Sequence, residues 1–138
     1  MTLYPLMALA SCWEEAGTRH GIPPLLLKAI AWKESRGDPR AVGPRLPDGN
    51  VAVGLMQINT VHLPSLAQYG IRREHLFDAC ISQEVGVWVL ANCIREYGAT
   101  WKAVGCYYTG PKSGNMHAQA EYVRDVQRFY AGYQRLEH

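Results

Sequence analysis

Glycine and proline interrupt this sequence at intervals that leave room for helices of ordinary length and little room for a sheet. Gly21, Gly70 and Gly98 each follow a stretch with helical periodicity, as residues that end helices do. The pair Pro23-Pro24 precedes another such stretch, at a position where a helix tolerates proline. No run of alternating apolar and polar residues is long enough to predict a strand of useful length. The predicted fold class is therefore all-α, with at most a minimal β-hairpin.

One long loop interrupts the series of predicted helices. Residues 36–53 hold several glycines and prolines and the turn pair Asp48-Gly49, and a loop of this length in a compact domain is more often functional than idle. Val51 to Val53 are candidates for a small hairpin. Helices are expected over residues 13–20, 24–35, 55–59, 63–69, 81–97, 101–108 and 117–135, of which the one over 81–97 is the longest.

The chain is long enough for one domain with a real core, since it has 138 residues. Its net charge is only +2, and its basic residues are scattered rather than grouped, so a nucleic-acid partner is not expected. The apolar stretch over residues 3–10 is too short to span a membrane. We expect a monomer that does not cross the membrane.

The first residues look different from the rest. Residues 9–12, Leu-Ala-Ser-Cys, look like the tail of an export signal, although the positive region of a complete signal is absent. Residues 1–11 are therefore predicted to be the remnant of such a signal or an N-terminal extension, and residues 12–138 to form the domain. Lipid attachment at Cys12 is a less favoured alternative.

Four cysteines indicate the compartment. Cys12, Cys80, Cys93 and Cys106 form no C-x-x-C pair and have no histidine at zinc-finger spacing, so no metal site is predicted. An even number suits disulfides, which imply an oxidising compartment. Of the three possible pairings we favour Cys93–Cys106, which would join two successive helices, together with Cys12–Cys80. The alternative is four reduced thiols in a cytosolic protein.

The helix expected over residues 24–35 carries a carboxylate on its apolar face. Helical spacing places five residues on this face: Leu26, Ala29, Ile30, Lys33 and Glu34. Partial burial and the negative end of the helix dipole would both raise the pKa of Glu34. A carboxylic acid that stays protonated near neutral pH can act as a general acid. On spacing alone, the alternative is that Glu34 pairs with a neighbouring Lys or Arg.

Four segments form an ordered set of motifs. They are residues 27–35 (LKAIAWKES), 52–59 (AVGLMQIN), 103–110 (AVGCYYTG) and 122–126, with Tyr122, Val123 and Val126. Together they resemble the soluble lytic transglycosylases, and most of all the small single-domain members that accompany secretion, pilus and conjugation machines. The resemblance implies a lysozyme-like fold and cleavage of the glycan strands of peptidoglycan over residues 12–138.

The resemblance also implies roles for single residues. Glu34 resembles the acid that protonates the leaving oxygen and then acts as base, Ser35 its immediate support, and Tyr107 the tyrosine that holds the carboxyl in place. The implied substrate-binding residues are Met56, Gln57, Asn59, Tyr108 and Tyr122. For Met56 the alternative is core packing, and for Tyr122 it is a buried place in its helix.

Two departures from the family pattern bear on the reaction. Tyr108 stands where the family has asparagine, and Ala52 stands where some small relatives carry an aspartate. Asp48 lies on a different part of the loop and is not interpreted as a nucleophile. Hydrolysis of a glycoside ordinarily uses two carboxylates, and only Glu34 is evident. The family's alternative needs no water, since the N-acetyl group of the muramic acid assists departure and its O6 closes onto C1.

The sequence therefore predicts a non-hydrolytic peptidoglycan lyase without metal or organic cofactor, located in the periplasm. Its partners would be glycan strands and a protein of a secretion, pilus or conjugation apparatus. Two alternatives stay open. One is a lysozyme-type hydrolase with the same acid, and the other is a weakly catalytic glycan-binding module for assembly.

Overall fold

The computed structural model describes residues 12–137, which are mainly helical with one two-stranded hairpin. Residues 12–19 are helical. The named elements are α2 (Pro24–Ser35), β1 (Ala52–Val53), β2 (Ile58–Asn59), η1 (Thr60–His62), α3 (Leu63–Leu66), η2 (Ala67–Tyr69), η3 (Arg73–Phe77), α4 (Ala79–Tyr97), α5 (Trp101–Thr109) and α6 (Met116–Leu136). The predicted fold class is confirmed. Among the described residues, no helix has the length and apolar character needed to cross a membrane.

Local chemistry explains where the main helices begin and end. Pro24 occupies the first turn of α2, where its missing N–H costs nothing. The carboxylate of Asp78 caps α4 by accepting a hydrogen bond from the Ile81 N–H at 3.0 Å. Gly98 ends α4 with a positive φ of 75°. The predicted boundaries of these helices therefore agree with the structure to within about two residues.

Two expectations about the elements were wrong. Residues 55–59 form no helix, because Gly54 and Gln57 take positive φ values of 82° and 51° and turn the chain tightly. The turn brings Ile58 opposite Val53, so β1 and β2 pair antiparallel as the predicted small hairpin. The longest helix is α6 with 21 residues rather than α4 with 19.

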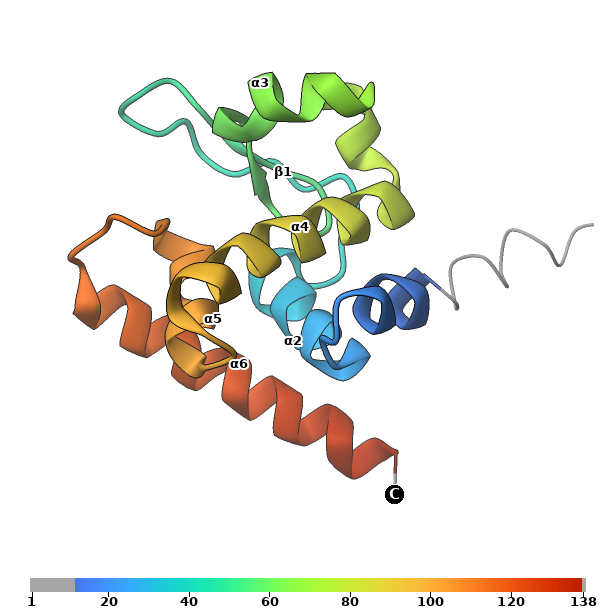
Figure 1. Ribbon diagram of the computed structural model, residues 1–138, viewed down its shortest axis with the longest axis vertical. Coiled ribbons are helices and arrows are strands. Elements are labelled where there is room, and N and C mark those ends of the chain that lie inside the picture. Colours follow the sequence, from blue (N-terminus) through green and yellow to red (C-terminus); the bar gives the residue numbers. More distant parts are fainter. Residues whose placement is uncertain (1–11, 138) are drawn as a thin grey trace, which may run out of the picture.

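The helices pack around α2, which lies in the middle of the molecule (Figure 1). α2 and α5 both pack against α6, and α4 packs against α5. The hairpin and α3 lie on the opposite side of α4 from α6 (Figure 1). Leu27 and Ile30 of α2, Met56 and Ile58 of the hairpin region and Leu90 of α4 meet in one buried cluster. The core therefore fixes the hairpin against the C-terminal end of α2.

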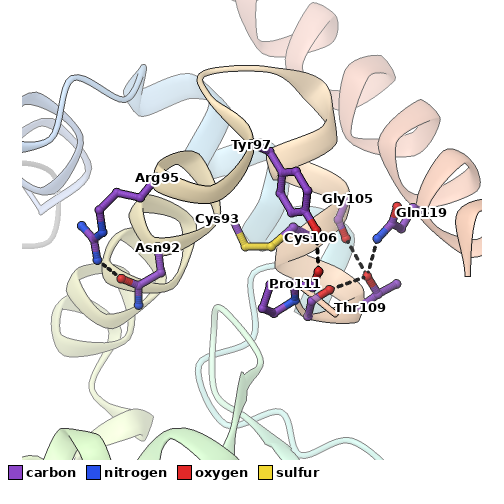
Figure 2. The surroundings of a disulfide bond; sticks show 10 residues. Asn92, Cys93, Arg95, Tyr97, Gly105, Cys106, Thr109, Pro111 and Gln119 are labelled. Atoms are coloured by element: carbon purple, nitrogen blue, oxygen red, sulfur yellow. Dashed lines mark hydrogen bonds between the residues drawn. A yellow bond between two sulfur atoms is a disulfide. The ribbon is translucent and has the colours of Figure 1, made fainter. Parts of the chain in front are cut away.

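Both predicted disulfides are present. Cys93 of α4 is bonded to Cys106 of α5, as Figure 2 shows, and Cys12 is bonded to Cys80 at the start of α4. The sulfur of Cys12 is therefore held within the fold. The expectation for residues 1–11 lies outside the described residues.

Candidate active site

Glu34 lies in the last turn of α2, partly buried, with its carboxyl in a groove between the hairpin and α5. Burial raises the pKa of this carboxyl from 4.5 to about 7. A hydrogen bond from Tyr122 and the positive charge of Lys33 act in the opposite direction and lower it. A carboxyl with a pKa near neutrality can both give and take a proton.

Tyr122 of α6 holds the carboxyl of Glu34. Its hydroxyl donates to Glu34 Oε2 at 2.8 Å, and the residue is only 2% exposed. We expected this contact from Tyr107, but the hydroxyl of Tyr107 donates to the carbonyl oxygen of Met56 at 2.6 Å. The reason is the close packing of α6 on α2, which places Tyr122 beside Glu34 and leaves Tyr107 of α5 to reach the hairpin turn.

The alternative in which Glu34 forms a simple ion pair does not match the structure. The adjacent lysine, Lys33, donates to Asp125 Oδ2 of α6 at 2.8 Å instead. Lys33 and Glu34 are neighbours on α2, and both are linked to α6, one through Asp125 and the other through Tyr122. These two contacts fix the C-terminal end of α2 against α6.

Ser35 supports the site through the backbone of the hairpin turn. Its Oγ donates to the Leu55 carbonyl at 2.7 Å and also contacts the Ala31 carbonyl at 3.2 Å. It makes no direct hydrogen bond to Glu34. Ser35 therefore positions the turn of residues 54–57 next to the carboxyl, while the Ser82 Oγ of α4 accepts from the Met56 N–H at 3.0 Å.

The side chain of Met56 lies in the core and does not line the groove, which differs from our expectation of a substrate-binding residue. The residue is 0% exposed and belongs to the core. Its side chain lies against Gly86 of α4, where an added Cβ would meet Met56 Cε at 2.8 Å. The core-packing alternative is therefore the right one for Met56, and its backbone carbonyl, held by Tyr107, is the part nearest the site.

Gln57 and Asn59 both line the groove. In each amide one group is already hydrogen-bonded within the protein: the donor of Gln57 and the acceptor of Asn59. The Nε2 of Gln57 donates to the carbonyls of Ala41 and Gly54, at 3.1 and 2.9 Å. The Oδ1 of Asn59 accepts from the Val61 N–H at 2.8 Å. Gln57 therefore keeps its Oε1 as an acceptor, and Asn59 keeps its Nδ2 as a donor.

The ring of Tyr108 stacks on that of Tyr122. The ring centroids are 4.8 Å apart and the planes lie within 5° of parallel. Tyr108 is 54% exposed, whereas Tyr122 is buried. The Tyr122 ring therefore has the buried place that we gave as the alternative, while its hydroxyl reaches the carboxyl of Glu34. Tyr108 covers one face of this ring and also lines the groove.

The part of the groove beside Glu34 has a volume of about 160 Å³. It is lined by Glu34, Leu46, Ala52, Gln57, Ile58, Asn59, His62, Val89, Tyr107 and Tyr108. Glu34 is the single carboxylate among these described residues. Ala52 lines the groove but offers no charge, and Asp48 lies outside it, exposed and accepting a hydrogen bond from the Asn50 N–H at 2.9 Å.

His62, Leu46 and Val89 are among the groove residues that sequence reasoning missed. His62 packs edge-on against Trp88, and its partial burial lowers the pKa of the imidazole. Nothing local distinguishes these residues, because they come from a 3-10 turn, a loop and the middle of a helix. Among residues 12–137, no group of three or more His, Cys, Asp or Glu side chains is placed to hold a metal ion.

Comparison with known proteins connects this geometry to a family. The family model described as "Transglycosylase SLT domain" matches residues 11–129, which is most of the chain.

Several relatives are similar over nearly the whole chain. The X polypeptide of Escherichia coli strain K12 is 40% identical over 124 residues, covering 88% of this chain and 73% of the relative. Invasion protein IagB of Salmonella typhimurium is 37% identical over 124 residues, covering 89% and 77%. Protein IpgF of Shigella flexneri is 36% identical over 127 residues, covering 91% and 83%.

Proposed function

We propose, from the premise that this chain belongs to the transglycosylase SLT domain family, that Glu34 is its one catalytic carboxylate. Membership of this family makes the chain a lytic transglycosylase, a glycan lyase that acts on peptidoglycan. The observation that supports Glu34 most directly is a carboxyl with a pKa of about 7 that faces a groove in which no other lining residue is a carboxylate.

In the first step, protonated Glu34 gives its proton to the glycosidic oxygen, which joins C1 of the muramic sugar to C4 of the next sugar. The C1–O bond breaks, and the leaving sugar departs with a free 4-hydroxyl. The acetamido oxygen of the muramic sugar meets the positive charge at C1, which is the part that a second carboxylate would play in a hydrolase. Glu34 is left as an anion and accepts the hydrogen bond from Tyr122.

In the second step, the Glu34 anion takes the proton from the muramic O6 hydroxyl. The O6 then bonds to C1 and displaces the acetamido oxygen, so a 1,6-anhydro ring forms. Glu34 is again protonated, and the atoms balance without water or any co-reactant. The raised pKa favours the acid in the first step, and the Tyr122 hydrogen bond favours the anion that the second step needs.

Gln57 and Asn59 suit the recognition of an N-acetylated sugar. An acetamido group offers one N–H donor and one carbonyl acceptor, which match the acceptor left on Gln57 and the donor left on Asn59. Tyr108 adds an exposed aromatic face to the same groove. We assign Gln57, Asn59 and Tyr108 to substrate binding, and Ser35, Tyr107 and Tyr122 to support of the catalytic carboxyl.

The decisive experiment is a mass-spectrometric profile of the products formed from purified peptidoglycan by the wild-type chain and Glu34→Gln. The two side chains are nearly isosteric, so the variant should fold and lose cleavage. Products ending in anhydro-muramic acid, each one water lighter than a hydrolysis product, are expected. Asp48→Asn is the matched control, because this exposed carboxylate lies outside the groove, and it should cleave like the wild type.

Each other result would point to a named alternative. Products with reducing ends would indicate a lysozyme-type hydrolase, and loss of their formation in Asp48→Asn would identify the second carboxylate. Binding to peptidoglycan without any products would favour an assembly module. Cleavage retained by Glu34→Gln would contradict the role of Glu34.

The setting of the reaction is also a proposal. Two disulfides among the described residues suit an oxidising compartment, which supports the periplasm, where peptidoglycan lies. The printed name of IagB, an invasion protein, supports service to a secretion apparatus, whereas a pilus or conjugation machine rests on the sequence resemblance alone. We propose that residues 12–138 form the catalytic domain that opens the wall locally for such a machine.

A further inference from the structure

The groove does not end at the catalytic carboxyl. A second hollow of about 380 Å³ continues it, and the two parts share five lining residues: Asn59, His62, Val89, Tyr107 and Tyr108. Because the same side chains border both parts, the second hollow lies directly beside the site of Glu34. We call this second hollow the distal subsite.

The walls of the distal subsite are held in place by covalent and hydrogen bonds. Cys93 of α4 and Cys106 of α5 line it and are joined by a disulfide (Figure 2). The Tyr97 hydroxyl donates to the carbonyl oxygen of Pro111, which ties the turn after α5 to the end of α4 (Figure 2). The distal subsite is therefore formed in advance, and little ordering is required when it binds a ligand.

Glu96 carries the only formal charge among the residues that line the distal subsite. It is exposed and, within residues 12–137, forms no ion pair or hydrogen bond through its side chain. The nearby cations are engaged differently: Arg95 donates to Asn92, and Lys102 lies over the Tyr97 ring. Glu96 also stands in the last turn of α4, where the helix dipole disfavours a negative charge. A cationic ligand would supply the charged partner that Glu96 lacks and would offset the unfavourable helix dipole.

The remaining lining suits an aliphatic chain better than a sugar ring. More of the lining is apolar than polar, with Val61, Val89 and Pro111 on the apolar side and Asn92 and Thr109 on the polar side. Its aromatic rings, those of His62, Tyr107 and Tyr108, belong to the residues that the two hollows share. A mainly apolar lining with one carboxylate, that of Glu96, matches an aliphatic side chain with a terminal amine. Peptidoglycan carries such a group on the stem peptide, which begins on the muramic sugar whose glycosidic oxygen Glu34 protonates.

We propose that the distal subsite binds the stem peptide of peptidoglycan, with Glu96 pairing with the free amine of its diamino acid. This inference rests on the proposed function and deepens it, since it names the form of the glycan that the groove prefers. An exposed ion pair contributes up to about 1 kcal/mol, so the amine should raise kcat/KM by roughly two- to fivefold.

The test compares the wild-type chain and Glu96→Gln on three forms of the same glycan strands. One form bears stem peptides with free amines, the second has those amines acetylated, and the third has the peptides removed. We expect the wild type to prefer the first over the second by about two- to fivefold at low salt. Glu96→Gln should cleave both at one rate while cleaving the peptide-free strands like the wild type.

Glu121→Gln is the matched control, because this exposed carboxylate lies on α6 and pairs with His117 outside the distal subsite. It should keep the preference for free amines. The same preference in Glu96→Gln as in the wild type would overturn the proposal, and so would equal rates of the wild type on the first two substrates. Cleavage of none of the three forms by the wild type would overturn the proposed function, and this proposal with it.

Discussion

At the scale of single residues, two opposing effects meet on the carboxyl of Glu34. Burial favours the protonated form, whereas the hydroxyl of Tyr122 donates a hydrogen bond that favours the anion. A group that gives a proton in one step and takes one in the next works best when its pKa lies near the working pH. The pKa of about 7 meets this requirement through one buried position and one hydrogen bond.

Activity should fall as the pH rises through about 7, because the first step needs protonated Glu34. In Tyr122→Phe the hydrogen bond that stabilises the anion is lost, so the pKa of Glu34 rises and this decline moves to higher pH. The rate at the optimum should fall roughly tenfold, the equivalent of about 1.4 kcal/mol. A pH profile of cleavage by both proteins tests this, and an unmoved decline would contradict the role of Tyr122.

Tyr107→Phe is the matched comparison for that experiment. The Tyr107 hydroxyl donates to the Met56 carbonyl and not to Glu34, so its loss should loosen the turn of residues 54–57. We expect slower cleavage and a free energy of unfolding lower by about 1 kcal/mol. The decline with pH should stay close to that of the wild type, in contrast to Tyr122→Phe. An unchanged rate would remove Tyr107 from the site.

The raised pKa of Glu34 also predicts how stability depends on pH. The folded protein holds this proton up to about pH 7, whereas the unfolded chain loses it near 4.5. The group therefore contributes stability below pH 4.5, and this contribution is lost as the pH rises through 7. Relative to the wild type, Glu34→Gln should gain roughly 2–3 kcal/mol between pH 4.5 and 8. Denaturant unfolding at both pH values checks this, and parallel pH dependences would show that Glu34 is not desolvated.

At the scale of elements, the turn of residues 54–57 connects the hairpin to α2, the helix that carries Glu34. Ser35 of α2 binds its Leu55 carbonyl, and Tyr107 of α5 binds its Met56 carbonyl. The turn depends on Gly54, which has a φ of 82° and lies against the backbone of Leu76. Three elements therefore have to meet at one short turn before Gln57 can face the groove.

Gly54→Ala should disrupt this junction. An added Cβ would lie 2.1 Å from the Leu76 carbonyl oxygen, and the left-handed backbone adds further strain. We expect a loss of more than about 3 kcal/mol in the free energy of unfolding. Gly70→Ala is the control, since Gly70 has a similar φ of 73° and nothing within 4 Å, and should lose only about 1 kcal/mol. Equal losses in thermal unfolding would show that the contact with Leu76 is unimportant.

At the scale of the whole molecule, the two disulfides fasten different parts of the fold. Cys12–Cys80 spans 68 residues and ties the N-terminal helical segment to the start of α4. Cys93–Cys106 spans 13 residues and ties α4 to α5 beside the groove. Cys12–Cys80 therefore joins the two ends of the long segment that contains the hairpin. Cys93–Cys106 holds together two helices that line the distal subsite.

Replacing each pair of cysteines by alanine should separate these effects. The chain-entropy estimate gives a loss of about 4 kcal/mol for Cys12–Cys80 and about 3 kcal/mol for Cys93–Cys106. In protein that remains folded, only the second replacement should reduce cleavage, because only that disulfide lines the groove. Unfolding curves and rates on peptidoglycan measure both effects. Equal activity of the two variants would contradict a role for the Cys93–Cys106 wall.

The sequence alone determined what depends on neighbouring residues along the chain. Gly21, Gly70 and Gly98 end helices because their backbone is free to turn, so most element boundaries could be read directly. The helical periodicity around Glu34 placed the carboxyl on the apolar side of α2, and the ordered motifs singled it out. These features depend on neighbouring residues or on short sequence motifs, so they can be recognised without knowing how the helices pack.

Only the tertiary structure decided which side chains meet. The packing of α6 on α2 brings Tyr122 rather than Tyr107 to Glu34, and the packing of α4 under the hairpin buries Met56. The positive φ of Gln57 turned an expected helix into a hairpin. Glu96 and His62 enter the groove only because distant elements converge there. The physical reason is that hydrogen bonding and burial are set by distances across the fold, which no spacing along the chain fixes.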